Sequence, residues 1–324
     1  MSIQQTANSG ALIRTQVWAD YVKERLEDTL IATRFATSVD FMDGNTLNIP
    51  SIGQLVAQDY QEGKSVTFQS PDLGNFQFVL TDYADVSFAI TDKAKRDIFY
   101  YNQLMADIPV NMARALQVRV EQDILALSGS QTAANPNVIN DFAHRFVGSG
   151  TNQILTVADI RYARLSLIKA NITPNRLVGI VDPTVELQLR ADTTISASIT
   201  NQPMWADILS DGLSGDTGLQ FKYNIEGFDI YTSNYLRNPG SEAINGGAGS
   251  RNAGANAVSN MFFSADPMHK VFLYGVRKPV TVSEWRDNDA KQDKYSVDTE
   301  YGVALCRPEG LVVINTNVST SANI

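Results

Sequence analysis

The most regular hydrophobic pattern in this chain lies between residues 102 and 127, where an apolar side chain recurs at every fourth position. These positions are Ile108, Met112, Leu116, Val120 and Ile124. Side chains at this spacing share one face of an α-helix, so the pattern predicts a long amphipathic helix. Pro109 either breaks or kinks this run or begins its second half, and residues 128–130 end it. Thr91 and Asp92 are suited to cap the helical sequence that follows them.

A different pattern covers residues 46–90, where apolar and polar residues alternate as they do in β-strands. The alternating segments are residues 46–50, 54–59, 65–69, 76–80 and 83–90. Pro50 ends the first of them, and residues 61–64 form a polar turn. The apolar residues are thinly spread, and a two-stranded ribbon of this kind is marginal alone in water. We therefore expect long antiparallel strands that lie on another surface.

The remaining sequence mixes helical and strand patterns. Helices are expected at residues 15–35, 156–171 and 184–191, with a short helical stretch within 200–209. Within 156–171, Val157, Ile160, Leu165 and Ile168 are expected on one side, with Thr156 as the cap. Strands are expected at residues 176–181, 221–223, 227–231, 261–264, 271–275, 280–285, 295–301 and 311–315.

Three segments lack this periodicity. Residues 1–10 are polar and small, residues 129–153 are rich in Ser, Thr, Asn and Gly, and residues 238–259 are rich in Gly, Asn, Ala and Ser. They are expected to form a terminal arm, a long connection and a surface loop. A charged stretch at residues 286–294 lies between two strands and predicts a hairpin tip. The fold class is therefore α+β.

Composition supports a globular chain with a substantial core. The chain has 324 residues, of which 44% are hydrophobic and 19% charged, and these proportions are ordinary for folded proteins. Its net charge of −9 argues against a surface that grips phosphates or anionic lipid. An acidic protein can still enclose nucleic acid, because repulsion prevents the polymer from adhering. We expect neither a signal peptide nor a membrane span.

The residues that could carry catalysis are few. Cys306 is the single cysteine, which excludes an internal disulfide, and His144 and His269 are the only histidines. Cys306 has no neighbouring base or helix start to activate it. Nucleotide-binding, serine-hydrolase and metalloprotease motifs are absent. Asp287 and Asp289 resemble the start of a calcium loop, but Lys291 occupies a ligand position and the bidentate Glu at the end is missing. We expect no catalytic, cofactor or metal site.

The order of these elements resembles that of the major capsid proteins of tailed bacteriophages, which have the Hong Kong 97-type fold. The similarity extends from about Thr15 to Asn315 and depends on layout more than on a signature motif. The most similar stretches are residues 106–127 (ADIPVNMARALQVRVEQDILAL), 219–236 (LQFKYNIEGFDIYTSNYL) and 295–308 (YSVDTEYGVALCRP).

The resemblance implies four regions. Residues 1–44 correspond to an N-terminal arm with a helix, and residues 45–90 to an extended β-hairpin loop. Residues 91–150 and 273–324 correspond to a peripheral domain with a long spine helix, and residues 151–272 to an axial mixed α/β domain. The hairpin at residues 286–294 would lie where three capsomers meet.

The resemblance also implies a function. Such a protein forms pentamers and hexamers that build an icosahedral shell around double-stranded DNA, without catalysis, cofactors or a membrane. A scaffolding extension often precedes the arm in this family, so a separate scaffolding protein is implied, with a portal and a cement protein as further partners. Assembly would take place in the bacterial cytoplasm, and the mature location would be the virion.

The implied contact residues between subunits belong to the arm, the extended loop and the hairpin. They are Trp18, Arg25, Tyr60, Glu62, Lys64, Phe68, Arg286, Asp287, Asp289, Lys291 and Lys294. Three alternatives remain at this stage: an encapsulin-like nanocompartment shell on the same fold, a phage tail or connector protein, and a hydrolase or binding protein without a familiar motif.

Overall fold

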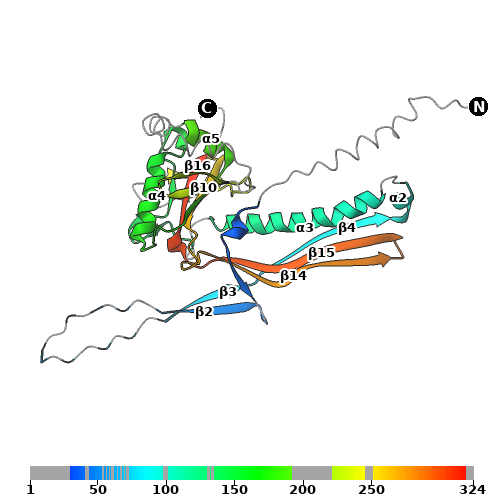
Figure 1. The fold of residues 1–324 in the computed structure, drawn as a ribbon, viewed down its shortest axis with the longest axis horizontal. Helices are drawn as coiled ribbons and strands as arrows, with labels where there is room; N and C mark the ends of the chain where they lie inside the picture. The colour runs from blue at the N-terminus through cyan, green and yellow to red at the C-terminus, as the bar shows by residue number, and fades with distance from the viewer. Residues whose placement is uncertain are drawn as a thin grey trace, which may run out of the picture.

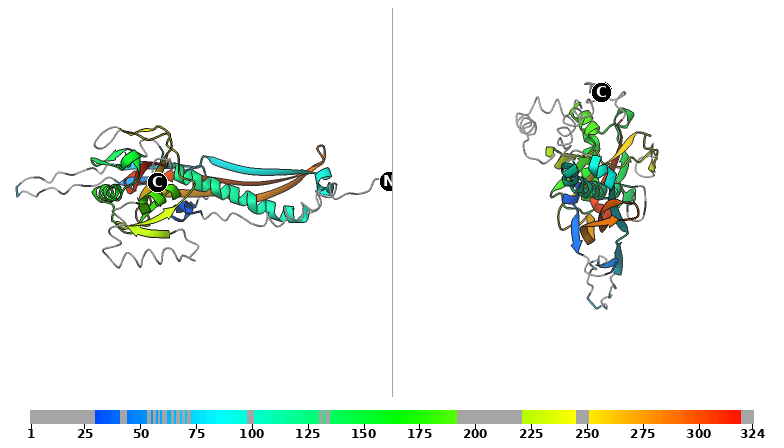
Figure 2. Two further views of the ribbon diagram at one scale, coloured as in Figure 1. Left: turned by 90° about the horizontal axis from the view of Figure 1, so that it is seen from above. Right: turned by 90° about the vertical axis from the view of Figure 1, so that its right-hand side faces the viewer.

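The computed structural model has a domain of helices and strands at one end, an elongated sheet that extends from it, and a narrow two-stranded ribbon (Figure 1). The view from above shows the same elongation, and the other view looks along the long axis (Figure 2). The structure describes residues 30–40, 44–52, 73–97, 101–129, 132, 135–191, 221–244 and 251–318, with residues 55, 57, 59, 62, 63, 65, 68 and 70.

The first region, called the compact domain here, is built on a six-stranded sheet. In spatial order its strands are β7 (Arg145–Val147), β16 (Leu311–Asn317), β13 (Ala257–Ser264), β8 (Leu177–Val181), β10 (Phe228–Thr232) and β9 (Phe221–Ile225). Every residue of β8 and β13 is buried. Such burial requires cover on both faces of the sheet.

Two helices, α4 (Val157–Lys169) and α5 (Pro183–Ala191), contribute to the core on one face of this sheet. The start of α4 is as predicted. The Thr156 hydroxyl accepts a bond from the Asp159 amide, and the Asp159 carboxylate accepts one from the Thr156 amide. This capping box satisfies two backbone donors that the first helical turn leaves free.

The buried side of α4 differs from the predicted one. Val157 and Ile160 are buried as expected, and Ala163 and Leu167 continue that side toward the sheet. Leu165 and Ile168, which were expected on the same side, are 41% and 44% exposed. Their inward assignment is therefore wrong, because positions 160, 163 and 167 define the face that meets the sheet.

The elongated sheet has four strands and carries a long helix on one face. In spatial order the strands are β1 (Thr37–Asp40), β14 (Phe272–Asp287), β15 (Gln292–Leu305) and β4 (Asp82–Thr91). β14 and β15 form a long antiparallel hairpin, so the two strands expected at 271–275 and 280–285 are one continuous strand. β4 adds to the outer edge of β15.

The long helix is α3 (Tyr101–Ala126), and it runs without interruption through Pro109. The alternative that Pro109 breaks the run is therefore wrong. Met112 and Leu116 are buried against Val297 of β15 and the inward residues of β4, as the four-residue spacing predicted. A short helix, α2 (Asp92–Asp97), precedes α3, and the Thr91 hydroxyl accepts a bond from the Ala94 amide at its start, at 3.3 Å.

The compact domain and the elongated sheet share a hydrophobic core. Val120, Ile124 and Leu125, near the end of α3, pack in one cluster with Met261 and Phe263 of β13. The 3-10 helix η1 (Ala32–Arg34) joins the same cluster through Ala32. This packing joins the end of α3 to the face of the six-stranded sheet that lies opposite α4.

The ribbon consists of β2 (Thr46–Ile52) and β3 (Leu73–Val79), paired only with each other. β2 continues past Pro50, so the expectation that Pro50 ends this strand is wrong. Proline is tolerated there because β2 has just one neighbouring strand and its other edge needs no donor. Phe78 and Leu80 anchor the ribbon on Leu273 of β14.

Two segments expected to be irregular contain short strands. Within 129–153 lie β5 (Val138–Ile139), β6 (Phe142–Ala143) and β7, with the 3-10 helix η2 (Thr151–Gln153) at the end. Within 238–259 lie β11 (Ala243–Ile244), β12 (Arg251–Asn252) and the start of β13. These strands have no periodic signal in the sequence, because most of them have only two or three residues. The start of β13 contains polar residues that are nevertheless buried. The 3-10 helix η3 (Pro308–Gly310) connects β15 to β16.

Some expectations fall on residues outside the described part of the chain. The stretch at 200–209 is one, and the helix at 15–35 is another except for its end, where η1 forms instead of an α-helix. Between residues 53 and 72, Glu62 and Gly63 form the predicted turn, and Gly63 has a φ of +83°. Residues 55, 57, 59, 65 and 68 do not lie in strands. The strands expected at 54–59 and 65–69 are therefore not formed at the residues that the structure describes there.

Candidate assembly surfaces

The tip of the β14–β15 hairpin holds a set of charges that neutralise one another. Lys294 Nζ lies 2.8 Å from Asp287 Oδ2, while Asp287 Oδ1 accepts bonds from the amides of Asp289 and Ala290, both at 3.1 Å. The bond from Lys294 and those amides lower the pKa of Asp287 to about 2. The tip is thus the charged hairpin turn that the sequence predicted, and the Asp287 carboxylate is paired within its own subunit.

The same tip is tied to α2. Arg286 Nη2 lies 2.7 Å from Asp92 Oδ2, and Arg286 Nη1 lies 3.4 Å from Asp293. Lys95 of α2 also pairs with Asp293. These bridges orient the end of the elongated sheet, although exposed ion pairs contribute only about 0–1 kcal/mol each.

The implied contact residues of the hairpin therefore fall into two groups. Arg286, Asp287 and Lys294 have partners inside the subunit. Asp289 and Lys291 are exposed, and neither side chain has an ion-pair partner among the described residues.

The implied contact residues between β2 and β3, and those of the N-terminal arm, lie only partly within the described part of the chain. Glu62 is exposed, and the Phe68 side chain is 94% exposed. Exposing a phenylalanine to this extent is unfavourable, since burial of its ring is worth about 1.5–3 kcal/mol. Trp18, Arg25, Tyr60 and Lys64 lie outside the described residues.

A polar cluster centred on Asp298 joins β4, β14 and β15 on the face opposite α3. Asp298 accepts bonds from Tyr83 OH at 2.7 Å and Thr281 Oγ1 at 2.9 Å, and it pairs with Lys278. The bonds from Lys278, Tyr83 and Thr281 lower the pKa of Asp298 to about 2. The sequence carries no signal for this cluster, because its members are far apart in the chain and resemble ordinary exposed strand residues.

Glu121 holds the start of the described chain against α3. Its carboxylate is fully buried and accepts bonds from the amides of Ile31 and Ala32 at 2.9–3.0 Å. Nearby, Tyr301 OH donates to Asp123 Oδ2 at 2.5 Å, and burial raises the pKa of Tyr301. Glu121 is one of three consecutive polar residues, with Gln122 and Asp123, so its sequence context is the same as that of an exposed acid.

A buried ion pair lies where α3 ends. Arg145 is fully buried, and it donates to Ser128 O at 2.7 Å and to Glu242 Oε1 at 2.6 Å. Arg237 binds the other oxygen of Glu242 at 2.9 Å. Burial lowers the pKa of Arg145, and Glu242 opposes that effect. The network links the end of α3, β7 and residues 237–242, and the polar loop sequence gave no sign of it.

The candidate catalytic residues are in unreactive surroundings. His144 is buried with Nδ1 3.2 Å from Phe142 O, and burial lowers its pKa. His269 Nε2 lies 2.8 Å from Thr173 Oγ1. Burial raises the pKa of Cys306, which disfavours the reactive thiolate. In the described residues, no three His, Cys, Asp or Glu side chains cluster as metal ligands would, and no helix has the length and apolar character of a membrane span.

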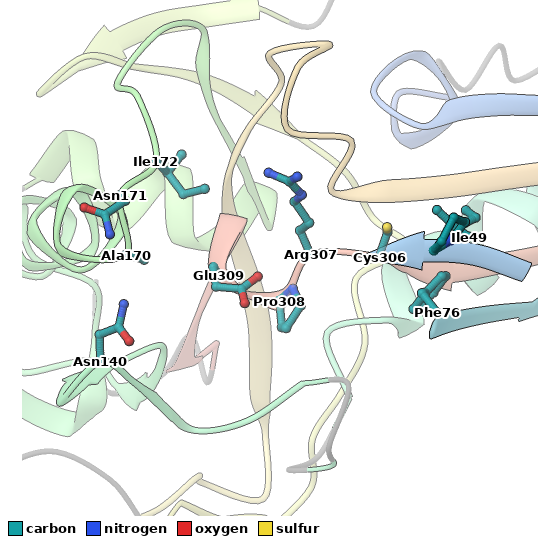
Figure 3. Close-up of a pocket in the computed structure, with 11 residues that line it drawn as sticks. Ile49, Phe76, Asn140, Ala170, Asn171, Ile172, Cys306, Arg307, Pro308 and Glu309 are labelled. Carbon is teal, nitrogen blue, oxygen red and sulfur yellow. The ribbon is translucent and has the colours of Figure 1, made fainter. Parts of the chain in front are cut away.

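A hollow of about 800 Å³ lies between the compact domain and the base of the ribbon (Figure 3). Ile49 and Phe76 of the ribbon form one side, and Ala170, Asn171 and Ile172 at the end of α4 form another. Asn140 and the turn between β15 and β16 complete it, with Cys306, Arg307, Pro308 and Glu309. Apolar side chains of the ribbon and of residue 172 thus face a polar turn that carries Arg307 and Glu309.

Comparison with known proteins gives a consistent result. A family model described as phage capsid protein matches residues 77–314, which is most of the chain. The search of curated proteins found no match to this chain.

Among solved structures, the capsid of cyanophage Pam1 has a TM-score of 0.66 at 15% identity, with 92% of this chain and 95% of that chain covered. A structure from Mycobacterium phage Che8 has a TM-score of 0.61 at 18% identity, with 90% and 93% covered. An encapsulin complex from Synechococcus elongatus has a TM-score of 0.56 at 8% identity, with 99% and 98% covered. At these identities the likeness shows a shared fold, the α+β fold that the sequence resembled.

Proposed function

The chain belongs to the phage capsid protein family, and from this premise we propose that it is the major capsid protein of a tailed phage. It would assemble through pentamers and hexamers into an icosahedral shell around double-stranded DNA. The observation that carries the proposal is the family match across residues 77–314, which extends from the ribbon strand β3 to β16. A structural role in the virion capsid follows from the family, and the chemistry of the described side chains suggests no competing catalytic role.

The exposed ribbon supports assembly. Its base is anchored by Phe78 and Leu80. Phe68, in the segment that joins β2 to β3, lies almost fully in solvent. A ribbon that covers part of a neighbouring subunit would bury that side chain, and each subunit would both give and receive such a contact. Head-to-tail contacts of this type close into rings, and a shell interface of the obligate class buries roughly 2,000 Å² or more.

The proposal includes partners and a division of the chain. The regions 1–44, 45–90, 91–150 with 273–324, and 151–272 would serve as arm, extended loop, peripheral domain and axial domain. β4 (Asp82–Thr91), which falls almost wholly within the proposed extended loop, pairs antiparallel with β15 of the elongated sheet. A separate scaffolding protein, a portal and a cement protein would complete the particle, with assembly in the host cytoplasm.

Deletion of residues 54–73 tests the proposal. Because the anchoring residues of β2 and most of β3 remain, we expect a soluble, folded subunit that forms no shells, whereas the intact chain forms closed particles visible by negative-stain electron microscopy. A matched control replaces the same residues with a Gly/Ser linker of equal length. Normal particles from either variant would refute the role of the ribbon, and an intact chain that stays monomeric would refute the proposed function.

The encapsulin-like alternative keeps one observation in its favour, since the fold matches an encapsulin over nearly the whole chain. The contents of particles purified from the native source distinguish the two. Double-stranded DNA, protected from nuclease, supports the phage capsid, and a packaged enzyme without DNA supports the nanocompartment.

A further inference from the structure

Two buried polar side chains in the six-stranded sheet have polar atoms that bind nothing else in the described part of the chain. Ser259 of β13 and Asn315 of β16 are both 0% exposed. Among the described residues, neither the Ser259 hydroxyl nor either polar atom of the Asn315 amide, Oδ1 or Nδ2, finds a hydrogen-bond partner. Burying such groups without hydrogen bonds costs free energy, so folded proteins seldom leave them unsatisfied.

The two side chains are neighbours on one face of the sheet. Ser259 and Asn315 are directly opposite each other in the antiparallel pairing of β13 with β16, which places their Cβ atoms about 4.5–5.5 Å apart. Met261 and Val313, two residues along each strand, face the same way and belong to the core cluster at the end of α3. The hydroxyl and the amide therefore project into one region of the core without binding each other directly.

A third unpartnered group comes from the next strand. Arg145 of β7 lies on the same face, because Asn315 pairs with Val147 and residues two apart in a strand face the same way. Its Nη1 and Nη2 atoms bind Ser128 O and Glu242 Oε1, whereas its buried Nε has no partner among the described residues. The unpartnered atoms on this face thus include donors, an acceptor and a hydroxyl that can act as either.

The segment that precedes β13 closes this region. The Arg237 carbonyl accepts a bond from the Ser259 amide at 3.0 Å. Further along, the Glu242 carbonyl accepts one from the Ala253 amide at 2.9 Å. Ala253 and Ala257 are 4% and 0% exposed. Alanine side chains have no polar atom, so they cannot supply the missing hydrogen bonds, and their small size is compatible with a small molecule beside Ser259.

We propose that Ser259, Asn315 and Arg145 hold at least one internal water molecule between β13, β16 and β7. Water fits this set because it both donates and accepts. A halide would leave the Asn315 Oδ1 acceptor unpaired, and a metal cation would meet N–H donors and the charge of Arg145. Buried waters make about three hydrogen bonds each to polar groups that the protein leaves unsatisfied. The site lies within one subunit, so it does not depend on the proposed shell function.

The sign of one stability change tests this inference. Alanine fits wherever serine fits, so Ser259→Ala removes the hydroxyl without a clash. If the hydroxyl binds water, the melting temperature of the unassembled chain should fall by about 2 °C or more. Removing a hydroxyl that binds nothing is instead neutral or favourable, so an unchanged or raised melting temperature overturns the inference.

Two further serine variants calibrate that measurement. The buried Ser166 hydroxyl donates to Ala143 O at 3.0 Å, so Ser166→Ala should show the fall expected for loss of a satisfied buried hydroxyl. Ser283 is exposed, so Ser283→Ala should change the melting temperature little. Ser259→Ala should resemble the first of these variants and not the second.

A direct test needs no substitution. A crystal structure or electron-microscopy map of the wild-type chain, at a resolution that shows ordered water, should contain density within hydrogen-bond distance of Ser259 Oγ and the Asn315 amide. Asn260, on the opposite face of β13, donates to Ile314 O at 3.1 Å and should show no such density. Missing density at Ser259 and Asn315, a protein side chain bonded there, or an anomalous bromide peak after exchange of chloride for bromide would each overturn the inference.

Discussion

The compact domain and the elongated sheet differ in how completely each covers its own strands. In the compact domain, β8 and β13 are buried at every residue, with hydrophobic clusters on both faces. In the elongated sheet, β14 is mostly exposed beyond Val276, and Val280, Val282 and Trp285 remain 46–62% exposed. One region is complete within a single chain, and the other presents uncovered surface, as expected of a subunit that functions in an assembly.

The elongated sheet has hydrophobic packing against a helix on one face only. α3 packs on β4 and β15, whereas β14 lies beyond its reach for most of its length. On the opposite face, polar side chains replace a core: Asp298 binds residues of β4 and β14, and Ser296 donates to Asp85. Such contacts fix the register of the strands but bury little apolar area, so this region depends strongly on α3.

The largest expected effect comes from breaking the contact between α3 and the sheet. Leu116→Asp would place an unpaired charge beside Met112 and Val297, where only 2% of the leucine is exposed. Burying a charge without a partner is severely destabilising. We expect loss of the folded subunit, measured by circular dichroism and gel filtration. Leu116→Met, which conserves volume, should cost less than about 1.5 kcal/mol, and a folded, assembling aspartate variant would show that α3 is not a core helix.

A pair of truncations sharpens the comparison at intermediate size. Phe262, in β13, is fully buried and packs edge-on against Phe228, with ring centroids 5.2 Å apart. Phe262→Ala should lower the free energy of unfolding by about 3–5 kcal/mol. Val282→Ala, at a position 62% exposed, should change it by no more than about 0.5 kcal/mol. Urea denaturation of unassembled subunits measures both, and similar values would mean that the two regions are equally self-contained.

The smallest expected effect is a pH dependence that belongs to the elongated sheet. The pKa of Asp298 is about 2 in the folded chain, against an ordinary value of 3.8. A carboxylate whose pKa falls on folding stabilises the fold above its unfolded pKa, and this stabilisation disappears as the pH falls from about 4 to about 2. Asp298→Asn should therefore lower the melting temperature at pH 6 and flatten its decline between pH 4 and 2. An identical decline in the variant and the wild type would show that Asp298 contributes nothing to acid sensitivity.

The elements with local signals were predicted well. The four-residue apolar spacing placed α3, Thr156 placed the start of α4, and the charged stretch after Trp285 placed the hairpin tip. The errors occur where a distant part of the chain provides the cover. Ala257 and Ser259 look like loop residues but are buried in β13 because β16 pairs with them, and Leu165 looks like a core residue but is left outside.

The candidate site follows the same division. The sequence identified the hairpin charges, but not that Arg286 would be taken by Asp92 of α2, 194 positions away. It did not indicate that Glu121 would bind the amides of Ile31 and Ala32, or that Arg145 would be buried with Glu242. A charged residue has the same sequence signal whether its partner is solvent or a distant group.

The sequence by itself determined helices α3, α4 and α5, the charged hairpin tip and the poverty of apolar residues in the ribbon, because periodicity and caps act within a few residues. The tertiary structure alone decided which apolar stripe of α4 is covered and which charges are paired. Those outcomes depend on long-range packing, where one helix face or one carboxylate meets whatever surface the rest of the chain brings to it.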